Sequence, residues 1–184
     1  MSKYGKRPIL SACFVIALAA SRHASAQTTI LCLDSQPGDY IGGGKQLTIT
    51  LADGAFSASR NFDNGVSIQV NAVGGFWSLN FAAPGDAQLA AGTYDHATRW
   101  PFQAPVSPGL DVSGQGRGCN TSTGSFVVRE AGYGPSGEVV AFAADFEQHC
   151  EGFAAALRSS APFAITRQSL RRPSSHHRRG VRLA

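Results

Sequence analysis

One short stretch of the chain concentrates groups that can do chemistry. Four ionisable side chains occur there at every second position: Asp145, Glu147, His149 and Glu151. Alternate residues of a β-strand point to the same face, so this spacing predicts three carboxylates and one imidazole on one surface. Carboxylate oxygens favour Ca²⁺ and an imidazole favours Zn²⁺. These four residues are therefore candidate ligands of a divalent cation, with Ca²⁺ as the candidate cofactor.

The same residues fit two other interpretations. Carboxylates on alternate strand positions lie about 6.5 Å apart, near the separation that glycosidases use, so Asp145, Glu147 or Glu151 can also act as the acid and base of a hydrolase. The simpler interpretation is the solvated face of an amphipathic strand, which needs no ligand. The sequence has no Gly-x-Ser-x-Gly, His-Glu-x-x-His or Cys-x-x-Cys motif. That absence favours a non-catalytic protein.

Two cysteines are expected to fix the strand that pairs with this stretch. Residues 132–137 form a Gly- and Pro-containing turn between two apolar runs, and Cys119 and Cys150 are equidistant from its centre. Directly opposed residues of an antiparallel pair have Cα atoms about 4.5 to 5.5 Å apart, within the range of a disulfide. The sequence therefore predicts a Cys119–Cys150 disulfide, with Cys32 left as a buried thiol.

This register also predicts a set of ligand-binding residues. Asn120 and Ser122 are expected opposite the ionisable face, close to His149. Trp77 belongs to an apolar strand and is expected in the core, whereas Trp100 precedes a proline and is free to stack on a sugar ring. Trp100, Asn120, Ser122 and His149 are therefore the candidate ligand-binding residues.

The elements that must position these residues are short strands. Apolar Val66, Ile68 and Val70 alternate with polar Ser67 and Gln69, which gives the strand one dry and one wet face. Similar runs, bounded by turn residues, recur along the chain at 30–33, 46–51, 55–62, 66–71, 76–81, 93–99, 110–113, 125–130, 139–149 and 154–165. The pattern predicts an all-β fold: a single, jelly-roll-like β-sandwich of about ten short antiparallel strands.

The two ends of the chain differ from this middle part. Lys3, Lys6 and Arg7 precede an apolar run, and Ala-Ser-Ala follows at 24–26, which predicts a signal peptide over residues 1–26. The run is shorter than the roughly 20 residues that cross a membrane. We therefore expect an exported protein, periplasmic or extracellular, with no transmembrane segment in the mature chain. The β-sandwich domain is expected over 27–166, followed by a basic, disordered tail over 167–184.

The basic charge of the chain comes from its ends. The whole sequence has 16 Lys and Arg residues against 12 Asp and Glu, but residues 27–166 hold 6 basic and 12 acidic residues. An acidic domain repels phosphates. This charge balance argues against nucleic acid as a partner of the folded domain.

Four segments resemble a family of exported bacterial β-domains that has no established activity. They are Ser-Gln-Pro-Gly-Asp-Tyr-Ile-Gly-Gly-Gly at 35–44, Arg-Asn-Phe-Asp-Asn-Gly-Val at 60–66, Gly-Arg-Gly-Cys-Asn at 116–120 with Gly-Ser-Phe at 124–126, and Asp-Phe-Glu-Gln-His-Cys-Glu-Gly at 145–152. The resemblance spans about residues 30–157 and implies an extracellular domain found alone or beside adhesion-type modules. In such domains a short closing strand follows Gly152, where this sequence departs. A frameshift after Gly152 would explain the departure and would leave the last strand poorly formed and a sheet edge open.

These observations together predict a secreted, non-catalytic β-sandwich module that binds a surface ligand, with an extracellular glycan as the candidate partner. Two alternatives stay open. One is a glycosidase-like hydrolase that uses the strand carboxylates, and the other is a purely structural envelope or matrix protein.

Overall fold

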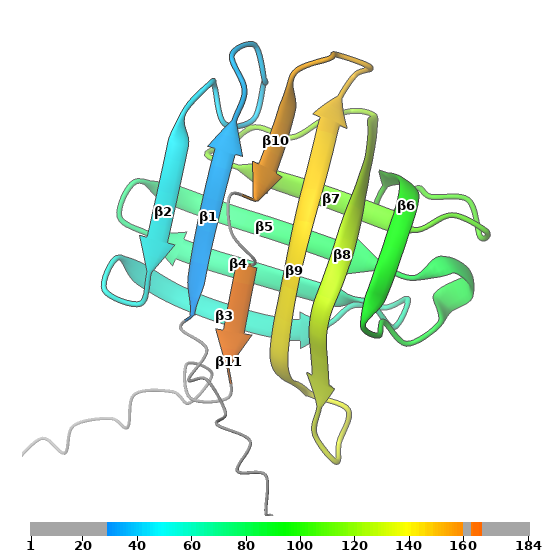
Figure 1. Cartoon of the computed structure of the whole chain (residues 1–184). Coiled ribbons are helices and arrows are strands. Elements are labelled where there is room, and N and C mark those ends of the chain that lie inside the picture. The colour runs from blue at the N-terminus through cyan, green and yellow to red at the C-terminus, as the bar shows by residue number, and fades with distance from the viewer. Residues whose placement is uncertain (1–28, 160–162, 167–184) are drawn as a thin grey trace, which may run out of the picture.

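The computed structural model describes residues 29–159 and 163–166, which form strands joined by turns and loops (Figure 1). The predicted signal peptide and basic tail lie outside these residues. Among the described residues, no helix is long and apolar enough to cross a membrane. The elements are β1 (Ile30–Ser35), β2 (Gln46–Thr50), β3 (Gly54–Arg60), β4 (Val66–Ala72), β5 (Gly75–Ala82), the short 3-10 helix η1 (Pro84–Asp86), β6 (Gly92–Arg99), β7 (Gly109–Gly114), β8 (Ser122–Tyr133), β9 (Val139–Cys150), β10 (Ala156–Ser159) and β11 (Phe163–Thr166).

The described strands belong to one hydrogen-bonded sheet, in the order β10-β1-β11-β9-β8-β6-β7-β5-β4-β3, with β2 paired to β1. Among the named strand pairs, only β6 and β7 run parallel, over two residues. The sheet folds over into two layers: β1, β2 and β8 to β11 form one, and β3, β4, β5 and β7 run across behind them (Figure 1). The predicted all-β, antiparallel class is thus confirmed, with one continuous sheet supplying both layers. The jelly-roll variant stays a prediction.

Aromatic rings hold the two layers together. The ring centroid of Phe81, on β5, lies 5.3 Å from that of Phe126 on β8 and 5.3 Å from that of Phe142 on β9. Phe146 of β9 packs on the same ring at 6.3 Å. Such aromatic pairs contribute roughly 0.5 to 1.5 kcal/mol each beyond their buried area. Trp77 is also buried, as the sequence predicts.

The C-terminal strands close the sheet instead of leaving an edge open. The single strand predicted over 154–165 is two strands, β10 and β11, and both pair with β1 on one side and β9 on the other. They therefore fill the space between β1 and β9, and their backbone groups are used in pairing. The expectation of a poorly formed last strand beside an open edge is wrong, because the sequence after Gly152 still supplies apolar residues such as Leu157 and Ile165, both fully buried.

Candidate functional site

The β8–β9 hairpin has a different register from the predicted one. Ser122, not Cys119, lies opposite Cys150, and Thr123 lies opposite His149. The reason is the position of the turn: the N–H of Gly134 donates to the carbonyl of Glu138 over 2.8 Å, so the tip of the hairpin comes later than the sequence suggests. Two register shifts, between Gly132 and Tyr133 and between Val128 and Glu130, offset each other, so the pairing at Cys150 keeps the register that the turn sets.

The register moves Ser122 away from the ionisable face. Its side chain lies on the core side of the sheet and is only 6% exposed. Thr123 and Ser125 instead lie opposite His149 and Glu147. The prediction that Ser122 lies close to His149 on one face is therefore wrong. Opposed residues of an antiparallel pair share a face, so Thr123 takes that place, and its neighbour Ser122 points to the other face.

The Cys119–Cys150 disulfide is confirmed although the two residues are not opposite each other in the ladder. Their Cα atoms are 5.2 Å apart. Cys119 precedes β8, and the loop that carries it is held to the end of β9 by the N–H of Glu151, which donates to the carbonyl of Thr121 over 3.0 Å. The disulfide therefore anchors the β7–β8 loop to β9. Cys32 is a buried free thiol, as predicted.

Asp145, Glu147 and His149 share the outward face of β9, as predicted, and we call them the hairpin face. Their ionisable groups bind one another or neighbouring arginines. The Nε of Arg129 lies 2.7 Å from Asp145 Oδ2 and the Nε of Arg158 lies 2.7 Å from Glu147 Oε2. His149 Nε2 lies 2.8 Å from Glu147 Oε1. The bond from Arg158 holds the pKa of the Glu147 carboxyl below its usual value; burial opposes it and His149 supports it.

Glu151 lies apart from the hairpin face. It follows β9 with a left-handed φ of 53°. Its carboxylate accepts hydrogen bonds from the N–H of Asn120 and, over 3.2 Å, from the hydroxyl of Thr121. The bond from Asn120 is the main cause that lowers the pKa of Glu151. Glu151 thus fixes the loop before β8 instead of extending an acidic row.

These contacts do not assemble the predicted metal ligands into one set. Within residues 29–159 and 163–166, no three His, Cys, Asp or Glu side chains converge on a common point. Strand alternation places Asp145, Glu147 and His149 on one face, but the two carboxylates are each bound by an arginine. A role for Ca²⁺ stays a prediction.

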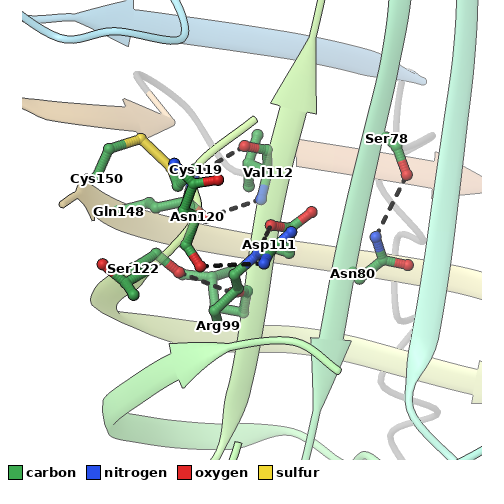
Figure 2. A network of polar contacts seen from close by, with 12 residues as sticks. Ser78, Asn80, Arg99, Asp111, Val112, Cys119, Asn120, Ser122, Gln148 and Cys150 are labelled. Carbon is green, nitrogen blue, oxygen red and sulfur yellow. Dashed lines mark hydrogen bonds and ion pairs between the residues drawn. A yellow bond between two sulfur atoms is a disulfide. The ribbon is translucent and has the colours of Figure 1, made fainter. Parts of the chain in front are cut away.

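A different polar centre forms where β6 ends. Arg99 is the last residue of β6, at the junction where β6 runs parallel to β7 (Figure 2). Its Nη1 donates to the carbonyl of Asn120 over 3.0 Å, and its guanidinium carbon lies 5.0 Å from the ring centroid of Phe102. Its Nε is buried, has no hydrogen-bond partner, and lies 3.7 Å from Asp111 Oδ1. Arg99 is therefore held in place while its buried Nε–H has no hydrogen-bond partner.

Two hollows share Arg99, and we call them together the Arg99 groove. The first has a volume of about 400 Å³ and the second about 320 Å³. Both volumes lie in the range of small-molecule sites. The first is lined by Thr98, Arg99, Phe102, Asn120, Thr121 and Ser122, and the second by Phe76, Arg99, Asp111, Ser113, Arg117 and three glycines.

Asp111 is the carboxyl group of the groove. It lies on β7 directly opposite Asn80 of β5. Burial raises the pKa of the Asp111 carboxyl from 3.8 to about 6, and the Arg99 guanidinium limits that rise. Asn80 is held by two serines. Its Nδ2 donates to Ser78 over 3.3 Å (Figure 2), and its Oδ1 accepts from Ser67 over 2.6 Å. A row of polar groups therefore crosses the outer face of this layer toward Arg99.

Arg117 reaches the groove from a tight turn. The backbone groups of Gly114 and Arg117 exchange two hydrogen bonds of 3.0 Å. The two residues between them, Gln115 and Gly116, have φ values of 53° and 76°, as a type I′ turn requires. Gly114 must be glycine, because a Cβ there would lie 2.3 Å from the ring of Trp77. The Gly-Gln-Gly-Arg sequence thus fixes where Arg117 leaves the backbone.

Gln148 supports the groove from inside. Its Oε1 accepts from the N–H of Val112 and its Nε2 donates to the carbonyl of Val112, both over 2.8 Å. Nε2 also lies 3.4 Å from the sulfur of Cys119. The side chain thus joins β9 of one layer to β7 of the other, next to Asp111 (Figure 2). The backbone N–H and carbonyl of Val112, on the edge of β7 that faces away from β5, obtain their hydrogen-bond partners in this way.

The structure separates the four predicted ligand-binding residues into two groups. Asn120 and Ser122 line the groove. Trp100 turns its indole N–H to Asp63 Oδ2, 3.0 Å away, and His149 belongs to the hairpin face. Sequence reasoning missed Arg99, Phe102, Asp111 and Arg117. No local signal in the sequence points to them, because they lie in different segments of the chain that only the fold brings together.

Comparisons of the chain with protein-family models, with curated proteins and with solved structures return no match. The family resemblance of the four segments therefore stays a prediction.

Proposed function

We propose that this chain is a non-catalytic binding module that holds a glycan in the Arg99 groove. The observation that carries the proposal is the composition of the first hollow. The ring of Phe102 is 73% exposed and lies beside the guanidinium of Arg99. Four polar residues complete the lining: Thr98, Asn120, Thr121 and Ser122.

This composition suits a sugar. An exposed ring offers a flat apolar surface, while a few fixed polar groups set orientation, which is the usual division of labour in a ligand site. The hydroxyl and amide groups both donate and accept hydrogen bonds, as sugar hydroxyls do. Asn120 is held by its disulfide-linked neighbour Cys119 and by the bond from its N–H to Glu151. The site is therefore fixed before a ligand arrives, which lowers the entropic cost of binding.

The same geometry argues against the hydrolase alternative. Glycoside hydrolysis usually needs two carboxyl groups on opposite sides of the scissile bond. Among the described residues that line the groove, Asp111 is the only carboxyl group. On the hairpin face, Asp145 and Glu147 are each engaged by an arginine at 2.7 Å. Neither place offers a free acid and base pair.

Binding of the full chain to a panel of immobilised neutral and acidic oligosaccharides, followed by biolayer interferometry, tests the proposal. We expect at least one oligosaccharide to bind, and Phe102→Ala to weaken that binding at least 10-fold. Phe62→Ala is the matched control, because Phe62 is also 77% exposed but does not line the groove. Its binding should stay within twofold of the wild type.

No binding by any oligosaccharide would overturn the proposal and favour a purely structural protein. Equal losses in Phe102→Ala and Phe62→Ala would also contradict it, because they would place the ligand away from the groove. Near-wild-type melting temperatures of both variants confirm that the comparison reports binding, since both side chains are largely exposed.

A further inference from the structure

The arginines of the described chain differ in how their charges are used. Arg129 and Arg158 each lie 2.7 Å from a carboxylate oxygen. Arg99 lies 3.7 Å from its nearest carboxylate, and Arg117 has no carboxylate within 4.0 Å among the described residues. Arg60 also has no carboxylate within 4.0 Å among the described residues, but its guanidinium donates to the side-chain oxygen of Asn64. Arg99 and Arg117 line the same hollow of about 320 Å³.

The charge in that hollow is unusual for this domain. Arg99 and Arg117 bring two positive charges, and Asp111 is the only carboxyl group among the described residues that line it. Residues 27–166 as a whole hold twice as many acidic as basic residues, 12 against 6. A positively charged hollow attracts an anionic group through its local electrostatic field. The acidic surface around it repels the same group, so binding is directed to the hollow.

The chemistry of the two arginines fits an acidic oxygen group. A guanidinium presents its N–H donors in a planar fork that matches a carboxylate or a sulfate. The Nε of Arg99 is buried and lacks a hydrogen-bond partner, whereas the side chain as a whole is 34% exposed, so a ligand oxygen would meet the exposed part of the guanidinium. Phe76, 44% exposed at the edge of the same hollow, offers a second apolar surface.

The groove is longer than one sugar ring. Arg99 pairs with Leu110 at one end of β7, and Gly114, at the other end, pairs with Trp77, the neighbour of Phe76. Four steps of about 3.3 Å along β7 separate these points by about 13 Å. An oligosaccharide of that length can reach from Phe102 to Phe76. Arg99 and Arg117 both line the hollow that Phe76 also lines, and the guanidinium of Arg117 lies beside Gly43.

We infer that the ligand of the Arg99 groove is an acidic saccharide, whose carboxylate or sulfate group is bound between Arg99 and Arg117. The inference rests on the proposed glycan-binding function and names the class of glycan.

Isothermal titration of the full chain with matched pairs of saccharides tests the inference. Trigalacturonate is compared with its methyl ester, and dextran sulfate with dextran. We expect the charged member of at least one pair to bind 10- to 100-fold more tightly, because a charge-assisted hydrogen bond contributes roughly 1.5 to 3 kcal/mol. The pair that shows the difference identifies the carboxylate or the sulfate as the bound group.

Arg117→Gln should remove at least a 10-fold part of this difference without disturbing the fold, because Arg117 follows an exposed turn and has no close ion pair among the described residues. Arg99→Gln should also reduce the affinity difference at least 10-fold. Arg129→Gln is the control, because it removes an equal charge beside the hairpin face, and it should leave the affinity within twofold of the wild type. Equal affinity for the charged and uncharged members would overturn the inference and leave glycan binding standing. No binding of any saccharide would overturn both.

Discussion

The hairpin face and the Arg99 groove lie on outward surfaces of the molecule and carry similar residue types, yet they differ in what their charges do. On the hairpin face, the carboxylates of Asp145 and Glu147 lie 2.7 Å from arginine nitrogens. In the groove, the one ion pair measures 3.7 Å and leaves the Nε of Arg99 without a hydrogen bond. A dense run of charges in the sequence is therefore no measure of the charge available to a ligand.

The difference follows from where each residue lies in the sheet. Arg158 of β10 is directly opposite Glu147, and Arg129 of β8 is one diagonal position from Asp145. Opposite charges at such cross-strand positions pair readily. Arg99 lies at the end of β6, where the parallel pairing with β7 covers only two residues. Side chains there face a loop and a hollow instead of a neighbouring strand.

The largest effect should come from breaking the covalent support of the groove. Cys119→Ser with Cys150→Ser opens a link between residues 31 positions apart. In the chain-entropy account, a loop of that length contributes about 3 to 4 kcal/mol to the free energy of unfolding. Urea unfolding should show that loss, together with weaker saccharide binding. Cys32→Ser is the control, because it replaces a buried cysteine by serine without breaking a disulfide. A loss below about 1 kcal/mol in the double variant would contradict this account.

A smaller effect should follow from the buried carboxyl of the groove. Folding raises the pKa of Asp111 from 3.8 to about 6, so the folded protein binds a proton that the unfolded chain releases between these values. Stability from this group is therefore present below about pH 4 and is lost as the pH rises through 6. Asp111→Asn should remove this dependence. Relative to that variant, the wild type should lose about 2 to 3 kcal/mol between pH 4 and pH 7.

Urea midpoints of the two proteins at several pH values measure the difference. Asp145→Asn is the matched control, because the Asp145 carboxylate is bound by Arg129 on the hairpin face. Parallel stability curves for the wild type and Asp111→Asn would show that Asp111 titrates as an exposed carboxyl does.

The smallest effect is expected on the hairpin face. Glu147→Gln removes a partner of Arg158 and of His149, but the Glu147 side chain is 38% exposed and solvent screens the pair. The free energy of unfolding should fall by less than about 1 kcal/mol. Saccharide binding should not change. A Glu147→Gln variant that loses a hydrolytic activity of the wild type would instead support the carboxylate-based hydrolase.

The local pattern of the strands was predictable from sequence. Val66, Ile68 and Val70 alternate with polar residues and are all fully buried. The disulfide was predictable too, although the predicted strand pairing is three residues off: it placed Cys119 opposite Cys150, where the structure has Ser122. Alternation sets which face a side chain takes, but the pairing of two strands depends on the turn between them. A turn closed by Gly134 and Glu138 does not show in the pattern of apolar residues.

The groove was beyond such reasoning for a different reason. Arg99 contacts Asn120, lies near Asp111, and shares a hollow with Arg117. These residues come from β6, β7 and the loop before β8, and only the fold of the sheet at the β6–β7 junction brings them together. No spacing rule within one element links them.

Nuclear magnetic resonance of the arginine Nε–Hε groups tests the central claim most directly, because it observes the charges of both regions in one sample. The chain labelled with ¹⁵N is titrated with trigalacturonate. We expect the signals of Arg99 and Arg117 to shift and saturate together, while those of Arg129 and Arg158 stay in place. Shifts confined to Arg129 and Arg158 would move the binding surface to the hairpin face and contradict the account.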